Sequence, residues 1–71
     1  MTAKEKDEKM QKAKNLMADR CTEIYTHATF LRKETDPERM LEFCRKIEDC
    51  IADVRRKKRV IEDLEYTPTE D

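Results

Sequence analysis

Three cysteines and a single histidine are the side chains best suited to metal binding or nucleophilic chemistry in this chain. They are Cys21, His27, Cys44 and Cys50. The two candidates within each half of the chain lie six positions apart, and on a helix that spacing points them about 120° apart. Metal ligands on one helical face lie three or four residues apart. We therefore expect no metal site, and an odd number of cysteines without a Cys-x-x-Cys pair indicates reduced thiols.

The composition also argues against an enzyme. The 71 residues include no Gly, which excludes glycine-dependent phosphate-binding loops, dinucleotide-binding turns and nucleophile elbows. Cys44 lies beside two cations, but no histidine is placed to act as its base. A bare pair of helices offers no pocket that would desolvate an acidic side chain and shift its pKa. We expect no catalytic residue, no cofactor and no small-molecule substrate.

A run of five consecutive cations is the strongest local charge feature. Together with two lysines of the first half it forms a candidate nucleic-acid contact: Lys12, Lys14, Arg55, Arg56, Lys57, Lys58 and Arg59. Acidic residues such as Glu62 and Asp63 are interleaved at the same end, and no aromatic side chain in the run would stack on bases. The net charge is −1, so a solvated face with ion pairs inside each helix is favoured. A small dimeric regulator that binds nucleic acid through this basic end is the alternative function.

Two helices joined by a short turn must position these residues. The one strong break lies mid-chain, where Asp36 before Pro37 is typical of an N-cap followed by the first helical residue. Thr35 with Glu38 offers a competing capping box. We predict one domain over 3–65, with a helix over about 3–33, a turn over 34–37, a helix over about 38–65, and a flexible tail over 66–71.

Apolar residues recur every seven positions in both predicted helices. The first helix has Met10, Met17, Ile24 and Leu31, with Cys21 and Ala28 at alternate positions. The second helix has Met40, Ile47, Val54 and Ile61, with Phe43, Cys50 and Leu64 at alternate positions. In an antiparallel hairpin the numbers of facing residues add to a constant, which pairs Cys21 with Cys50 and Ala28 with Phe43. The same register sets Lys14 opposite Lys57, and these two cations interrupt the apolar seam.

Several apolar residues remain outside this seam. Leu41, Cys44 and Ile51 lie on one flank of the second predicted helix and form the centre of the predicted partner interface, to which Leu16 and Phe30 of the first predicted helix are added. A two-helix hairpin is too thin to cover them, so we expect a second copy or a helical partner to complete a four-helix bundle. The other interpretation is that they are scattered exposed residues of the kind found on any protein surface.

These patterns predict an all-α protein built as an antiparallel, coiled-coil-like hairpin of two helices. Its expected function is a non-enzymatic protein–protein interaction module, such as an adaptor, a co-chaperone or a regulatory subunit. It would bind itself or a helical partner through the leftover apolar residues. The longest apolar runs are two or three residues, which argues against a membrane span or a signal peptide. We expect a cytoplasmic protein.

Overall fold

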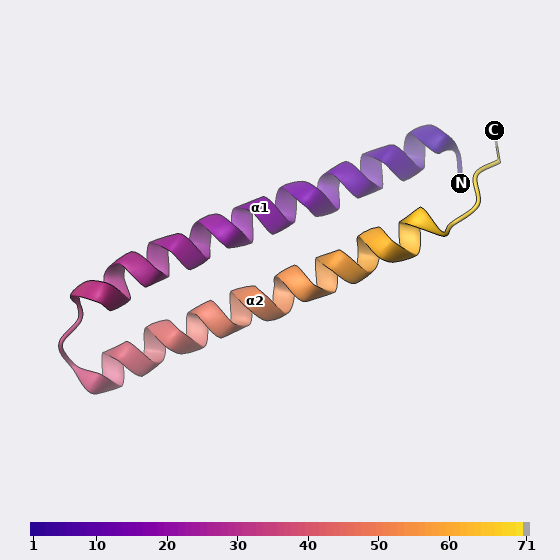
Figure 1. Ribbon diagram of the computed structural model, residues 1–71. Helices are drawn as coiled ribbons and strands as arrows, with labels where there is room; N and C mark the ends of the chain where they lie inside the picture. Colours follow the sequence, from indigo (N-terminus) through magenta and orange to yellow (C-terminus); the bar gives the residue numbers. More distant parts are fainter. Residues whose placement is uncertain (71) are drawn as a thin grey trace.

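Two long helices lie side by side in opposite directions and are joined at one end by a short turn (Figure 1). The computed structural model describes residues 1–70. Helix α1 spans Ala3–Lys33 and helix α2 spans Pro37–Glu65, with no strand in the described part of the chain. The molecule is a rod with extents of 56 × 14 × 10 Å. The expected all-α antiparallel hairpin is confirmed.

Neither helix within residues 1–70 combines the length and the apolar character needed to cross a lipid bilayer.

Local sequence signals set the start of each helix. Thr2 caps α1, because its hydroxyl accepts a hydrogen bond from the backbone N–H of Glu5 at 3.1 Å. Asp36 caps α2 in the same way, by accepting from the backbone N–H of Glu38 at 3.1 Å. Pro37 fills the first helical position, where its missing N–H costs nothing. The aspartate cap therefore prevails over the competing capping box.

The seam between the helices follows a spacing of three and four residues on both. On α2 the side chains along it are Met40, Phe43, Ile47, Cys50, Val54, Lys57, Ile61 and Leu64, all buried or half-buried. On α1 they are Met10, Ala13, Met17, Arg20, Ile24, His27 and Leu31. Only three described residues are buried, with 4% to 8% of their surface exposed: Ala13, Cys50 and Leu64. The interior is therefore a thin strip along the seam.

The predicted seam is right on α2 and wrong at the alternate positions of α1. Cys21 and Ala28 are exposed and do not meet Cys50 and Phe43. At the alternate positions α1 instead turns Ala13, Arg20 and His27 inward. Each of them lies three positions after a residue of the heptad series. A charged residue is stable there because its guanidinium bonds one carboxylate on each helix.

The predicted pair of lysines in the seam is also wrong. Lys14 is exposed, and the neighbouring Ala13 takes the inward position. Lys57 does lie along the seam, half-buried, with Nζ 3.9 Å from the Asp53 carboxylate. The aliphatic stem of Lys57 covers the seam while its charge stays at the surface, so one cation replaces the expected two.

The two ends of the described chain, residues 1–70, meet at the open end of the hairpin (Figure 1). Lys6 Nζ donates to the backbone carbonyls of Glu65 and Thr67, each at 3.2 Å. The Met1 ammonium pairs with Glu70 Oε1 at 3.3 Å, and the Glu70 N–H donates to the Met1 carbonyl at 3.0 Å. Residues 66–70 of the predicted tail are thus non-helical and contact the start of α1. The last residue of that tail, Asp71, lies outside the described residues.

Candidate interaction surfaces

The hairpin presents two broad faces, one on each side of the seam. The first, here called the paired face, is defined by Leu16, Glu23, Phe30, Asp53 and Val60. The second, here called the apolar face, is defined by Cys21, Ala28, Leu41, Cys44 and Ile51. The two sets lie on opposite flanks of each helix, because positions two residues apart, such as Ile51 and Asp53, differ by about 200°.

A polar cluster joins the helices at the middle of the paired face. Arg20 Nε donates to Asp53 Oδ2 at 2.9 Å, and its Nη1 donates to Glu23 Oε1 at 2.7 Å. The Cys50 thiol donates to Glu23 Oε2 at 3.4 Å. Lys57 adds a second cation on the other oxygen of Asp53. One guanidinium therefore bridges α1 and α2 and satisfies a carboxylate from each.

The contacts within this cluster shift the ionisation of its members. The hydrogen bond from Arg20 lowers the pKa of Asp53 and, together with the Cys50 thiol, the pKa of Glu23. Hydrogen bonds to Asp53 and Glu23 in turn raise the pKa of Arg20. Burial raises the pKa of the Cys50 thiol, and Glu23 raises it further. The Cys50 thiol therefore stays protonated at neutral pH, which suits a structural side chain and not a nucleophile.

Aromatic contacts join the helices near the turn, also on the paired face. Phe30 stacks on Phe43 with ring centroids 6.0 Å apart and planes inclined by 13°. Lys46 Nζ lies 5.5 Å from the centroid of the Phe43 ring. Phe30 is 55% exposed, but one side of its ring is already engaged within the hairpin.

The five predicted interface residues therefore do not share one surface. Phe30 and Leu16 lie on the paired face, whereas the other three lie on the apolar face: Leu41, Cys44 and Ile51. Sequence reasoning grouped all five because each is apolar and lies outside the predicted seam. The sequence placed Leu41, Cys44 and Ile51 on one flank of the second helix, but it did not show which flank of the first helix lies beside them.

A hollow of about 220 Å³ lies toward the open end of the paired face. Its floor is apolar and consists of Ala13, Leu16, Val60 and Leu64. Its rim carries three lysines, Lys9, Lys12 and Lys57, and no acidic side chain lines it. Sequence reasoning named some of these residues separately but did not join them into a site. The available signal was Val60, an apolar residue that directly follows the basic run.

The apolar face has no cross-helix bonds comparable to those of the paired face. Within residues 1–70, none of its five side chains takes part in a hydrogen bond, an ion pair or a ring contact. Leu41 is 65% exposed and Ile51 is 38% exposed. The α1 side of this face carries the small residues Cys21 and Ala28, which the predicted register had put in the seam. Their exposure extends the apolar face from α2 onto α1.

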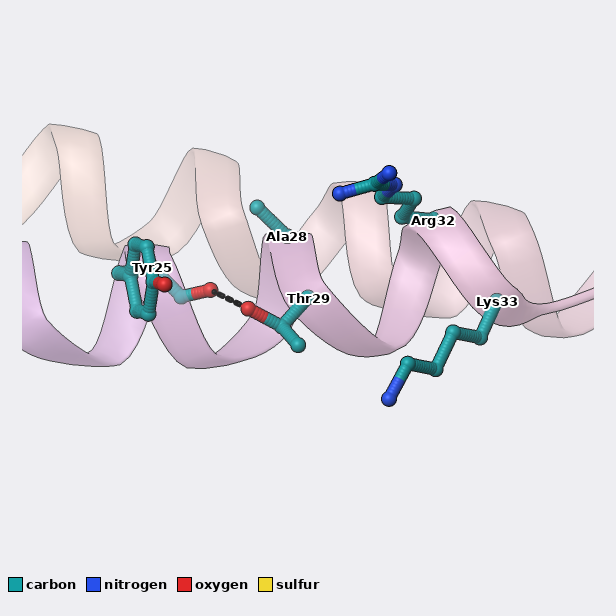
Figure 2. Close-up of a pocket in the computed structure, with 5 residues that line it drawn as sticks. All are labelled: Tyr25, Ala28, Thr29, Arg32 and Lys33. Carbon is teal, nitrogen blue, oxygen red and sulfur yellow. Dashed lines mark hydrogen bonds between the residues drawn. The ribbon is translucent and has the colours of Figure 1, made fainter.

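A second hollow, of about 300 Å³, continues the apolar face along α1 (Figure 2). It is lined by Tyr25, Ala28, Thr29, Arg32 and Lys33. Figure 2 shows Ala28 between the larger Tyr25 and Arg32, with Lys33 pointing away. The Thr29 hydroxyl donates to the Tyr25 carbonyl at 2.9 Å and is thereby satisfied. Tyr25, 75% exposed, was not part of the predicted interface, although its spacing from Cys21 and Ala28 places it on the same flank.

The predicted nucleic-acid contacts point in several directions. Lys57 lies along the seam, and Lys58 pairs with Glu62 at 3.4 Å. The other five are exposed: Lys12, Lys14, Arg55, Arg56 and Arg59. Consecutive residues of a helix turn by about 100°, so the run in α2 passes around the helix. The structure does not bring the seven cations together on one surface.

The chemically versatile side chains are also kept apart. Cys21 is exposed, Cys44 is half-buried and Cys50 is buried, and all three thiols are free. His27 lies along the seam. In the part of the chain that the structure describes, no group of three or more His, Cys, Asp or Glu side chains is arranged to hold a metal ion.

Comparison with protein-family models, with curated proteins and with solved structures finds no match for this chain.

Proposed function

We propose that this chain is a non-enzymatic interaction module that buries its apolar face against a helical surface. The occupant is a second copy of the hairpin, which would complete a four-helix bundle, or another helical protein. The observation that carries the proposal is the contrast in bonding. The paired face is joined by cross-helix bonds, whereas the apolar face exposes Leu41 and Ile51 with no bonded contact to α1.

The exposed area supports the need for a covering partner. The accessible surface is 5734 Å², whereas a compact monomer of 8.6 kDa would expose about 4,700 Å². The radius of gyration is 16.4 Å, against about 11 Å for a compact domain of this length. The excess area of about 1,000 Å² is similar to the roughly 800 Å² that one partner contributes to a standard interface.

The shape of the apolar face suits helix packing. Small side chains on α1, such as Ala28, let another helix approach closely, and the hollow beside Ala28 has room for a large side chain. Branched side chains on α2, such as Leu41 and Ile51, supply the apolar area that a partner would bury. The apolar face thus has a depression on α1 and projecting side chains on α2, and interdigitated helix packing uses both.

The thiols suit a reducing compartment. Three free cysteines, of which Cys21 is exposed, are typical of a protein kept away from an oxidising environment. We therefore propose a cytoplasmic location as part of the same account.

The test is the absolute mass of the purified chain, measured by light scattering on a sizing column over a range of concentrations. We expect the wild type to exceed the mass of one chain, and Ile51→Asp to return it to one chain while keeping its helical circular dichroism. Tyr66→Asp is the matched control, because it places the same charge at an exposed position directly after the end of α2, outside both faces. If Ile51→Asp only lowered the melting temperature and left assembly unchanged, the assignment of this face would be wrong.

A single-chain mass for the wild type would exclude self-association and leave a different helical protein as the occupant. A mobility shift with generic RNA and duplex DNA at two salt concentrations tests the alternative function. We expect no shift, because phosphate contacts need a basic surface and the cations here point in several directions. A shift at low salt that disappears at moderate salt would favour the nucleic-acid regulator instead.

A further inference from the structure

We infer that the paired face carries a second docking site, the hollow at its open end, and that this site takes an acidic amphipathic helix. The occupant would insert one large apolar side chain between α1 and α2 and place carboxylates against the three lysines of the rim. This site lies on the opposite side of the hairpin from the apolar face, so the inference does not rest on the proposed function.

The size of the hollow indicates the kind of group that it accepts. Its volume of about 220 Å³ exceeds the roughly 150 Å³ of an apolar cavity that binds benzene. It is smaller than the roughly 300 to 1,000 Å³ typical of small-molecule and cofactor pockets. One large aliphatic or aromatic side chain is therefore a better fit than a drug-sized ligand.

The floor of the hollow explains why the inserted group would be apolar. Leu64 and Ala13 are buried at its base, and Leu16 is half-buried beside them. Val60 is 43% exposed at the edge. These side chains offer no hydrogen-bonding groups, so a polar insert would lose its water without compensation, whereas an apolar insert would gain from burial.

The rim determines the charge of the occupant. Lys9 and Lys12 are exposed, and neither forms an ion pair with another described residue. Lys57 is held only loosely, with its Nζ 3.9 Å from the Asp53 carboxylate. Because the lining is cationic and contains no carboxylate, complementary charge must come from the partner.

The position of the hollow makes a helix the natural carrier of these groups. Both α1 and α2 contribute lining residues, so the hollow lies in the groove between two antiparallel helices, where a third helix can lie. On that third helix, acidic residues three or four positions before and after the apolar residue share its face. One turn rises about 5.4 Å, which places carboxylates on both sides of the inserted side chain.

The experiment uses an acidic helical peptide of about 16 residues with a central Trp and Glu three and four positions on either side. The protein has no Trp, so indole emission reports only the peptide. We expect a saturable blue shift that weakens as salt is added. Lys12→Glu should lower the affinity at least about tenfold, and Val60→Asp should abolish the shift. Arg45→Glu is the matched control, because it reverses an exposed charge on α2 away from the hollow.

Three results would overturn the inference. The first is a peptide with Gln in place of every Glu that binds equally well, since the rim would then play no part. The second is a Lys12→Glu protein that binds like the wild type. The third is a hollow that takes dodecyl phosphate and not the peptide, which would assign it to small anionic amphiphiles. Lys12 is exposed, so its variant should keep the wild-type circular dichroism and leave the test valid.

Discussion

The two faces of this hairpin are built from the same pair of helices but differ in how they satisfy their side chains. On the paired face, a guanidinium, two carboxylates, a thiol and two stacked rings contact one another across the seam. On the apolar face, the described aliphatic and small side chains form no hydrogen bond, ion pair or ring contact across the seam, and Leu41, Ile51 and Cys21 are exposed. We propose that the difference separates two roles: the bonds of the paired face fix how the helices sit together, whereas the apolar face is covered by a partner.

The comparison also shows how a thin molecule can hold its register. A seam made only of apolar side chains would pack almost as well after a small rotation of either helix. A directional bond such as that between Arg20 and Asp53 is lost on rotation, so it selects one arrangement. We propose that the polar cluster contributes more to specificity than to overall stability.

The strongest way to break the comparison is to destroy the seam that both faces share. Ile47→Asp puts a carboxylate between the helices in place of a half-buried side chain. We expect a cost of about 3 kcal/mol, a large fraction of the stability of a small domain. Thermal melting followed by circular dichroism should show loss of the cooperative transition. A melt that matched the Tyr66→Asp control would show that Ile47 does not lie in the seam.

A pair of alanine variants separates the faces more gently. Phe30→Ala removes the ring that stacks on Phe43 and should cost about 1 kcal/mol of hairpin stability, without changing assembly. Leu41→Ala removes an exposed side chain of the apolar face. It should weaken assembly and leave the stability of the hairpin unchanged. Denaturant melts and light scattering on the same samples give both quantities. If both variants changed the same quantity, the division into two faces would fail.

The smallest expected effect is a pH dependence that comes from the paired face. Because the folded pKa values of Asp53 and Glu23 are lowered, their contribution is fully present above the unfolded values, about 3.9 and 4.3. It is lost as pH falls through the lower folded values. The melting temperature should therefore fall as the solution is acidified below about pH 4.

Asp53→Asn is the variant that assigns this acid dependence. It keeps the shape of the side chain but removes the charge that pairs with Arg20, so part of the acid-dependent fall should disappear. Apolar-face variants such as Leu41→Ala should keep the wild-type pH profile. An Asp53→Asn profile identical to that of the wild type would show that the pair of Asp53 and Arg20 does not contribute to the acid dependence.

Much of the fold could be predicted from the sequence, because the start of a helix and the heptad pattern depend on neighbouring residues. The break at Asp36 and Pro37 is a helix start whatever the rest of the chain does. On α2 the heptad series is apolar at most positions, so counting residues finds the seam, including Cys50 and Leu64. These features depend on backbone chemistry and periodicity, which a single sequence contains.

The residues of α1 that face α2 could not all be predicted, because apolar character is a poor guide on this helix. Cys21 and Ala28 are the more apolar choice, whereas the structure turns Arg20 and His27 inward. That choice depends on Asp53, 33 residues away, which pairs with Arg20. Residue counting cannot weigh a bond between distant side chains, and the predicted interface was therefore divided between two faces.

Whether a partner covers the apolar face is tested by the alkylation rates of the three native thiols in intact cells that make the protein, compared with those in the purified Ile51→Asp variant. Cys21 and Cys44 belong to the apolar face, while the buried Cys50 is an internal reference. We expect Cys21 and Cys44 to react slowly in cells and rapidly in the variant, whatever protein covers the apolar face. Rapid alkylation of both thiols in cells, at the rates of the variant, would contradict this expectation.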